Sequence, residues 1–140
     1  MNRRLLLLSL VAGGVSLSLS TDAFAGSYLD RAKLLVEGTE DDCAMVRHSM
    51  MDKELALMVR VVAEARLKAA SKMEVPAAVA KAHPHLLLVL EHGERGASAA
   101  SDGNLKIAVE HLDDAIREAK MFRALLTELG FPLGSTRRST

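Results

Sequence analysis

One cysteine and five histidines are the side chains of this 140-residue sequence that could bind a metal ion through a thiolate or an imidazole. They are Cys43, His48, His83, His85, His92 and His111. Thiolate and imidazole are ligands that zinc and copper accept in proteins. A site would form only where the fold brings several of these residues to one level, so its prediction depends on the arrangement of the helices.

Sequence motifs of catalysis are absent. The chain has no Gly-x-Ser-x-Gly, Cys-x-x-Cys, Cys-x-x-Cys-His or His-Glu-x-x-His motif. No acidic residue has a histidine three positions later, as the Glu-x-x-His motif of di-iron bundles requires. The sequence therefore predicts a protein that is not an enzyme.

Residues 1–25 predict a cleaved secretory signal peptide. A basic start over residues 1–4 is followed by an apolar run over 5–19 and by the small-residue pattern Ala23-Phe24-Ala25. The apolar run falls short of the roughly 20 residues that span a bilayer, which argues against an uncleaved anchor. The mature chain is therefore expected to begin at Gly26, in the periplasm or secreted, without stable insertion in the membrane.

The pair Arg3-Arg4 also resembles a degenerate twin-arginine export signal. General secretion is favoured, because Asn2 stands where that signal has Ser or Thr and Leu6 stands where it has an aromatic residue.

Composition limits the function classes further. Hydrophobic residues make up 49% of the chain, enough to close the core of one small domain, and 18 Lys and Arg balance 18 Asp and Glu. A net charge of zero gives no electrostatic basis for binding nucleic acid.

The residue pattern predicts an all-α protein, because helix-forming residues dominate and no stretch alternates apolar and polar residues. The expected helices are at about 28–50, 52–73, 76–101 and 104–129. Helices of nearly equal length joined by short connections fold into an antiparallel up-down four-helix bundle. The expected organisation is a signal peptide at 1–25, a helical bundle domain at 26–132 and a disordered tail at 133–140.

Glycine and proline set most of the expected helix boundaries. The sequence Gly130-Phe131-Pro132 ends the last helix. Pro76 suits the first turn of the third helix, whereas Pro84 inside that helix predicts a kink. The first break is placed near 50–52, where the apolar pattern changes phase, and a break at Gly38-Thr39 is the alternative.

Each expected helix has an apolar stripe that should face the core. The stripes are Leu29, Ala32, Val36, Cys43, Val46 and Met50; Leu55, Met58, Val62, Ala65, Ala69 and Met73; Val79, Leu86, Leu90, Ala97 and Ala100; and Leu105, Val109, Leu112, Ile116, Ala119, Phe122, Leu126 and Leu129. The charged residues at 40–42 and 117–120 are expected to be solvated.

Small residues on the third helix would let a neighbouring helix approach closely. They are Gly93, Gly96, Ala97 and Ala100. The stretch 96–115 also resembles one tetratricopeptide hairpin, whose small residues would correspond to Gly96, Gly103, Ala108 and Ala115. The resemblance implies an antiparallel pair of helices there.

With these boundaries, an antiparallel bundle brings Cys43, Met45, Met58, His92 and His111 within about one helical turn of a common layer. We predict a metal site at Cys43, His92 and His111, for copper or zinc. A haem held by His and Met is a further alternative. In the simpler interpretation, Cys43 and Met58 are ordinary core residues and the histidines lie on the flank of the bundle.

The leading functional hypothesis is an exported, non-enzymatic helical bundle without a cofactor. It acts by protein–protein or self-association in the cell envelope, with an envelope protein or a second copy as partner. The alternative is a small-ligand or metal-binding bundle, with an apolar cavity where Gly93, Gly96 and Ala97 fill little space.

The export signal predicts the first residue of the mature protein. After expression of the full-length chain in a bacterial host, N-terminal sequencing of the periplasmic or secreted protein should begin at Gly26. A chain that begins at Met1 in the cytosolic fraction would contradict this prediction.

Overall fold

The computed structural model describes the backbone of residues 16–134 and the side chains of residues 24–134. All regular secondary structure in this part of the chain is helical. They are α1 (Ser16–His48), α2 (Lys53–Ser71), the short 3₁₀ helix η1 (Ala77–Val79), α3 (His83–Ser101) and α4 (Leu105–Glu128). The expected all-α fold is confirmed.

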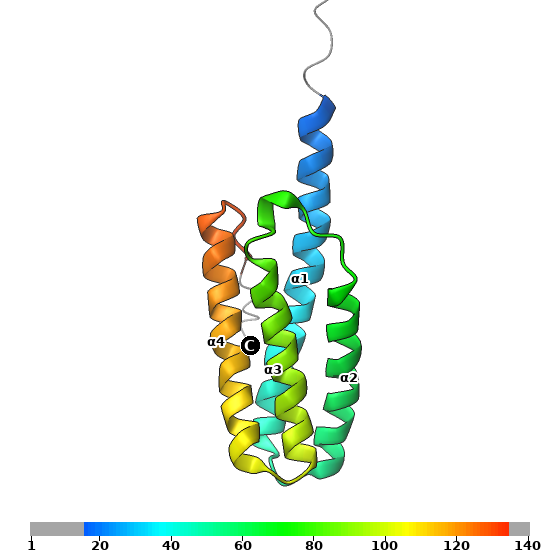
Figure 1. Ribbon diagram of the computed structural model, residues 1–140, viewed down its shortest axis with the longest axis vertical. Coiled ribbons are helices and arrows are strands. Elements are labelled where there is room, and N and C mark those ends of the chain that lie inside the picture. Colours follow the sequence, from blue (N-terminus) through cyan, green and yellow to red (C-terminus); the bar gives the residue numbers. More distant parts are fainter. Residues whose placement is uncertain (1–15, 135–140) are drawn as a thin grey trace, which may run out of the picture.

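The four α-helices form an up-down bundle in which α3 is central. In Figure 1, α2, α3 and α4 lie side by side, and α1 lies behind them. Helix α3 packs against each of the other three, and most extensively against α2 and α4. None of the helices within residues 16–134 has both the length and the apolar character needed to cross a bilayer.

Helix α1 begins earlier than expected and ends where expected. It starts at Ser16 rather than near residue 28, and its first turns project beyond the other helices (Figure 1). The cause is local, because the sequence from 16 to 27 contains a single glycine and no proline. At its other end α1 stops at His48, so the break lies at 49–52 and not at Gly38-Thr39.

The start of the predicted tail, 133–134, is not helical, and 135–140 lie outside the described residues.

The expected kink at Pro84 is wrong. Residues 72–82 form a connection that contains η1, and α3 begins at His83 with Pro84 in its first turn. Proline fits that place because the first N–H groups of a helix have no intrahelical partner to lose. The third helix is consequently shorter than the predicted 76–101, and the connection that precedes it is longer than expected.

Local signals set the other helix ends. The Asp52 carboxylate accepts a hydrogen bond from the Leu55 backbone N–H (2.9 Å) and caps the start of α2. Gly103 and Gly130 have positive φ angles of 80° and 87° and follow the ends of α3 and α4. Phe131 N–H then donates to the Leu126 carbonyl (2.8 Å), which closes the last helix as expected from its Gly-Phe-Pro sequence.

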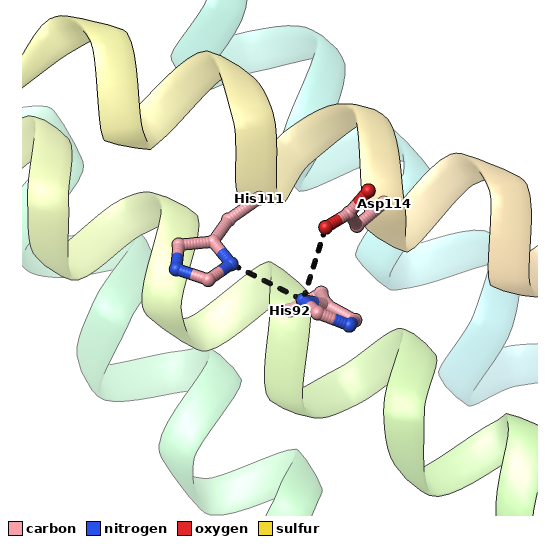
Figure 2. A group of neighbouring side chains, drawn as sticks. All are labelled: His92, His111 and Asp114. Atoms are coloured by element: carbon pink, nitrogen blue, oxygen red, sulfur yellow. Dashed lines mark hydrogen bonds and ion pairs between the residues drawn. The ribbon is translucent and has the colours of Figure 1, made fainter.

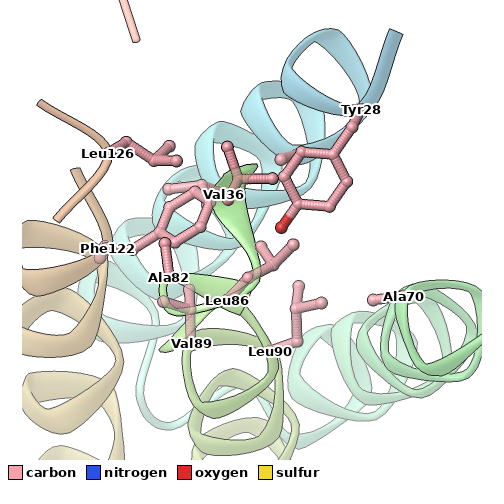
Figure 3. Packing of buried hydrophobic residues seen from close by; sticks show 12 residues of the cluster. Tyr28, Val36, Ala70, Ala82, Leu86, Val89, Leu90, Phe122 and Leu126 are labelled. Carbon is pink, nitrogen blue, oxygen red and sulfur yellow. The ribbon is translucent and has the colours of Figure 1, made fainter. Parts of the chain in front are cut away.

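The core consists of two clusters along the bundle. The Tyr28 cluster contains Tyr28, Ala32, Val36, Ala70, Val79, Ala82, Leu86, Val89, Leu90, Ala119, Phe122 and Leu126 (Figure 3). The Cys43 cluster contains Cys43, Val46, Ala56, Val59, Ala97, Ala100, Ala108, Leu112 and Ala115. The central members of the stripes predicted for α1, α3 and α4 are therefore buried, and those three predictions are confirmed.

The stripe predicted for α2 is wrong. Its buried residues are Ala56, Val59, Ala63 and Ala70, whereas Met58 and Val62 are exposed. The predicted face is rotated from the buried one by about a quarter of a turn. The physical reason is that α2 packs mainly on α3, and three alanines at seven-residue spacing allow a closer approach than the larger side chains would.

Helices α1 and α4 approach α3 closely at the glycines where the sequence predicts it. A Cβ atom on Gly93 would lie 2.6 Å from Cγ2 of Thr39 on α1, and one on Gly96 would lie 2.7 Å from Cδ2 of Leu112 on α4. Thr39 is itself buried, and its hydroxyl donates to the Leu35 carbonyl (2.8 Å). The predicted cavity near Gly93, Gly96 and Ala97 does not form at the two glycines, because these side chains fill the space beside them.

Three of the charged residues expected to be solvated, Glu40, Asp42 and Glu118, instead join helices, whereas Asp41, Arg117 and Lys120 are exposed as expected. Glu40 on α1 accepts two hydrogen bonds of 2.6 Å from the Arg123 guanidinium on α4, and these bonds raise the pKa of Arg123. Asp42 pairs with Arg66 on α2. Glu118 lies 2.6 Å from Nδ1 of His85. The pattern of charge in the sequence did not show these pairings, because each joins residues that are far apart in the chain.

The contact between Gly93 and Thr39 predicts a specific double-variant result. Gly93→Ala should lower the free energy of unfolding by about 1–2 kcal/mol, because overpacking outweighs the gain in helix propensity. In a Thr39→Ser background, which lacks Cγ2, the same change should be neutral or stabilising. Chemical denaturation followed by circular dichroism measures both effects. An equal loss of stability in the two backgrounds would contradict this account of the contact.

Candidate functional site

Two histidines and one aspartate form the only group of three potential metal ligands that the described side chains contain. His92 is on α3, and His111 and Asp114 are on α4. One nitrogen from each ring and one carboxylate oxygen all lie within 4.8 Å of one another. Figure 2 shows the three side chains converging between the two helices, with His92 of α3 facing both His111 and Asp114 of α4.

The close packing of α3 and α4 produces this convergence. His92 lies one helical turn before Gly96, and His111 directly precedes Leu112, the residue that packs on Gly96. The absence of a side chain at Gly96 lets the helices approach, so Nδ1 of His92 and Nδ1 of His111 are 3.2 Å apart. The planes of the two rings are tilted by 34°, and the ring centroids are 5.4 Å apart.

Asp114 completes the group because it follows His111 by three positions and therefore lies on the same side of α4. Its Oδ2 atom is 3.9 Å from Nδ1 of His92. Its other oxygen, Oδ1, accepts a hydrogen bond from Arg117, one turn further along the helix. Arg117 thereby orients the carboxylate and leaves Oδ2 directed at the two imidazoles.

The distances fit a shared ion. Two donors on a tetrahedral zinc ion with bonds of about 2.0–2.1 Å lie about 3.3 Å apart, close to the 3.2 Å between the two Nδ1 atoms. Oδ2 of Asp114 is 3.9 Å from Nδ1 of His92 and would have to move closer to share the same ion. Without an ion, one Nδ1 must carry the hydrogen that the other accepts. The same geometry can therefore hold a proton or a metal ion between the rings.

The structure brings together two of the three predicted ligands. His92 and His111 meet as the predicted layer requires, but Cys43 is not part of the group. Cys43 is 2% exposed within its core cluster, and burial raises the pKa of its thiol to about 12. Met45 and Met58 are 47% and 67% exposed, so these thioethers do not line the interior of the bundle.

Sequence reasoning missed Asp114. The search for di-iron motifs asked for an acidic residue followed three positions later by histidine, whereas this chain has the reverse order, His111-Leu-Asp-Asp114. Either order places the two side chains on one face of a helix. A search for His-x-x-Asp would therefore have found the pair.

The remaining histidines take part in other interactions or lie at the surface. Nδ1 of His83 is 2.9 Å from the hydroxyl of buried Tyr28, and burial lowers the pKa of His83. His85 is bonded to Glu118 as described. His48 is exposed at the end of α1.

A cleft of about 570 Å³ lies between α1 and the end of α2. Apolar side chains form much of its lining, including Phe24, Tyr28, Leu35 and Met73. Phe24 belongs to the predicted signal peptide, so cleavage after Ala25 would remove one wall of this cleft. We therefore do not assign the cleft as a ligand site.

Comparisons with family models, with curated proteins and with solved structures found no match to this chain. The candidate site is therefore argued from its own geometry.

The burial of Cys43 predicts that its thiol is unreactive in the folded protein. A thiol-specific disulfide reagent at mildly alkaline pH should modify it about a hundredfold more slowly than in denaturant, because the thiolate is the reactive form. A Met51→Cys variant supplies a matched control, since residue 51 is 81% exposed in the turn between α1 and α2 and its thiol should react at once. Equal rates for Cys43 and the added thiol would contradict the buried position.

Proposed function

We propose that this protein is an exported, non-enzymatic helical bundle that binds a divalent transition-metal ion at His92, His111 and Asp114. The observation that supports the proposal is the convergence of three ligand atoms from two packed helices within 4.8 Å. All three side chains are partly buried, so the ion would be shielded but still accessible to exchange. The proposal concerns binding, and no catalytic step is assigned to the site.

Zinc is the ion that this ligand set favours. Two imidazoles and one carboxylate provide three protein ligands and leave a fourth position open, an arrangement that zinc accepts. The cluster contains no thiolate or thioether, the soft ligands that select copper(I), and no methionine that could hold a haem together with histidine. Copper(II) accepts the same nitrogen and oxygen ligands as zinc, so it is the ion to compare directly.

Export is supported by the sequence of residues 1–25. Cleavage after Ala25 would leave α1 starting at Gly26, within two residues of the start expected from the apolar stripe. The proposed location is therefore the periplasm or the exterior of the cell.

A second candidate function is association with another protein chain. It is favoured by a separate observation, the exposure of Leu57, Met58, Val61 and Val62 on α2. These residues are not part of the metal cluster, so the two functions are compatible.

Zinc titration of the metal-free protein tests the metal site. Isothermal titration calorimetry should give one zinc ion per chain, and His92→Ala, His111→Ala and Asp114→Asn should each weaken binding about tenfold or more. Zinc should also stabilise the fold, by about 2.7 kcal/mol at a free concentration one hundred times Kd.

Two control variants separate this site from the alternatives. His48→Ala removes an exposed histidine outside the cluster, and Cys43→Ala removes the only cysteine. Both should leave zinc affinity unchanged. The spectrum of the cobalt(II) form should lack a thiolate charge-transfer band. Unchanged binding in all three cluster variants, or no binding of zinc or copper(II) to the unaltered protein, would refute the proposal.

A further inference from the structure

Helix α2 presents a large apolar face to solvent. Leu57, Met58, Val61 and Val62 are 50%, 67%, 61% and 46% exposed. They occupy adjacent positions on successive turns, and Ala65 continues the exposed stripe toward the end of the helix. Contiguous apolar surface of this kind marks an interaction site more often than isolated exposed side chains do.

The fully buried residues of α2 are smaller than several of its exposed apolar residues. The face buried against the bundle has Ala56, Ala63 and Ala70, with Val59 the largest buried side chain. Leu57 and Met58 lie on the exposed side of the helix, whereas Leu55 and Leu67 are partly buried against the two core clusters. A monomer gains nothing from placing its larger apolar side chains in water, so a second packing surface accounts for this arrangement.

Charged residues limit the apolar stripe at its two ends. Glu54 lies in the first turn of α2 and Lys68 in the last turn, and both are exposed. At 100° per residue, Glu54, Val61 and Lys68 point within about 20° of one direction, with Leu57 and Ala65 on either side of it. Glu64, which is also exposed, lies at one edge of the stripe, about 60° from Val61. The stripe therefore has a negative end, a mainly apolar middle and a positive end.

We propose that this face of α2 binds a second copy of the same chain, with the two α2 helices antiparallel about a two-fold axis at Val61. In this arrangement Glu54 of each copy lies opposite Lys68 of the other. Leu57 lies opposite Ala65, so a large side chain meets a small one. Val61 packs against itself at the axis.

Charge complementarity favours a second copy of the chain as the partner, and it favours the antiparallel orientation. The stripe is complementary to itself only when the helices are antiparallel, because a parallel pair would place Glu54 against Glu54 and Lys68 against Lys68. Antiparallel α2 helices also oppose their helix dipoles favourably. The same surface patch thus serves both partners, as a two-fold interface requires.

The size of the face predicts a dimer of moderate affinity. The 19 residues of α2 extend about 28 Å at 1.5 Å per residue. Two such faces would bury about 1,000 Å² in total, near the lower limit for specific interfaces. We therefore expect monomer and dimer to exchange as the protein concentration changes.

Sedimentation velocity of the purified protein, after expression of the full-length chain, tests the dimer. Over about a hundredfold range of concentration, the sedimentation coefficient should rise from the monomer value to the dimer value. Val61→Glu should increase the dimer dissociation constant about tenfold or more, because it places two carboxylates together at the axis. Circular dichroism should show an unchanged fold, since residue 61 is exposed.

Two matched variants serve as controls. Met121→Glu introduces the same charge at an exposed apolar residue of α4, and it should leave the dimer intact. Asp114→Asn alters the metal cluster and should also dimerise normally, so failure of the metal proposal would not affect this one.

Charge reversal tests the orientation. Glu54→Lys and Lys68→Glu should each weaken the dimer, because each places like charges opposite one another at both ends. The double variant should restore it. Oxidation should crosslink a Val61→Cys variant to itself efficiently, whereas Glu54→Cys should not crosslink, because residue 54 lies opposite residue 68 of the other copy.

A protein that stays monomeric at all concentrations would overturn the proposal, even if a different protein were found bound to α2. A dimer unaffected by Val61→Glu would also overturn it. Loss of dimerisation in each single charge variant without recovery in the double variant would refute the antiparallel arrangement.

Discussion

The close approach of the other helices to α3 is the constraint on which this structure depends. Helix α3 contacts α1, α2 and α4, and a bundle with one central helix is possible only where that helix has little side-chain volume. Gly93 accommodates the Thr39 side chain, and Gly96 accommodates Leu112. Alanines on the buried face of α2 have the same effect from the other side. Small residues therefore determine the distances between helices, and the larger side chains of the Tyr28 cluster fill the opposite half of the bundle.

The candidate metal site follows from that constraint. The contact at Gly96 and Leu112 holds α3 and α4 close enough for His92 and His111 to meet, and Arg117 turns the Asp114 carboxylate toward them. Polar interactions then fix α1 against its neighbours. Tyr28 bonds to His83, and burial raises the pKa of Tyr28 to about 12, so its hydroxyl stays protonated and available as a donor. The Glu40–Arg123 pair ties the middle of α1 to α4.

Helix α2 shows why an apolar pattern does not by itself identify a buried face. Its sequence has apolar residues around most of its circumference, so several stripes satisfy the helical period equally well. The stripe with larger residues was the more natural prediction because larger residues gain more from burial. The structure buries the alanines instead, since α3 accepts a close neighbour there. Leu57, Met58, Val61 and Val62 then remain on the outside, where they are available to a second chain.

The sequence by itself determined the helical class, the four helices and the break near 50–52. It also determined the close contacts on α3 and the buried stripes of α1, α3 and α4. These features could be predicted because periodicity and glycine or proline signals act locally. It also placed His92 and His111 in one layer, because antiparallel helices of known boundaries fix which residues lie level. Only the tertiary structure decided that Cys43 lies in the core apart from them, that Asp114 joins them, and which face α2 buries. Those outcomes depend on the rotation of each helix about its own axis, which is set by contacts between residues distant in sequence.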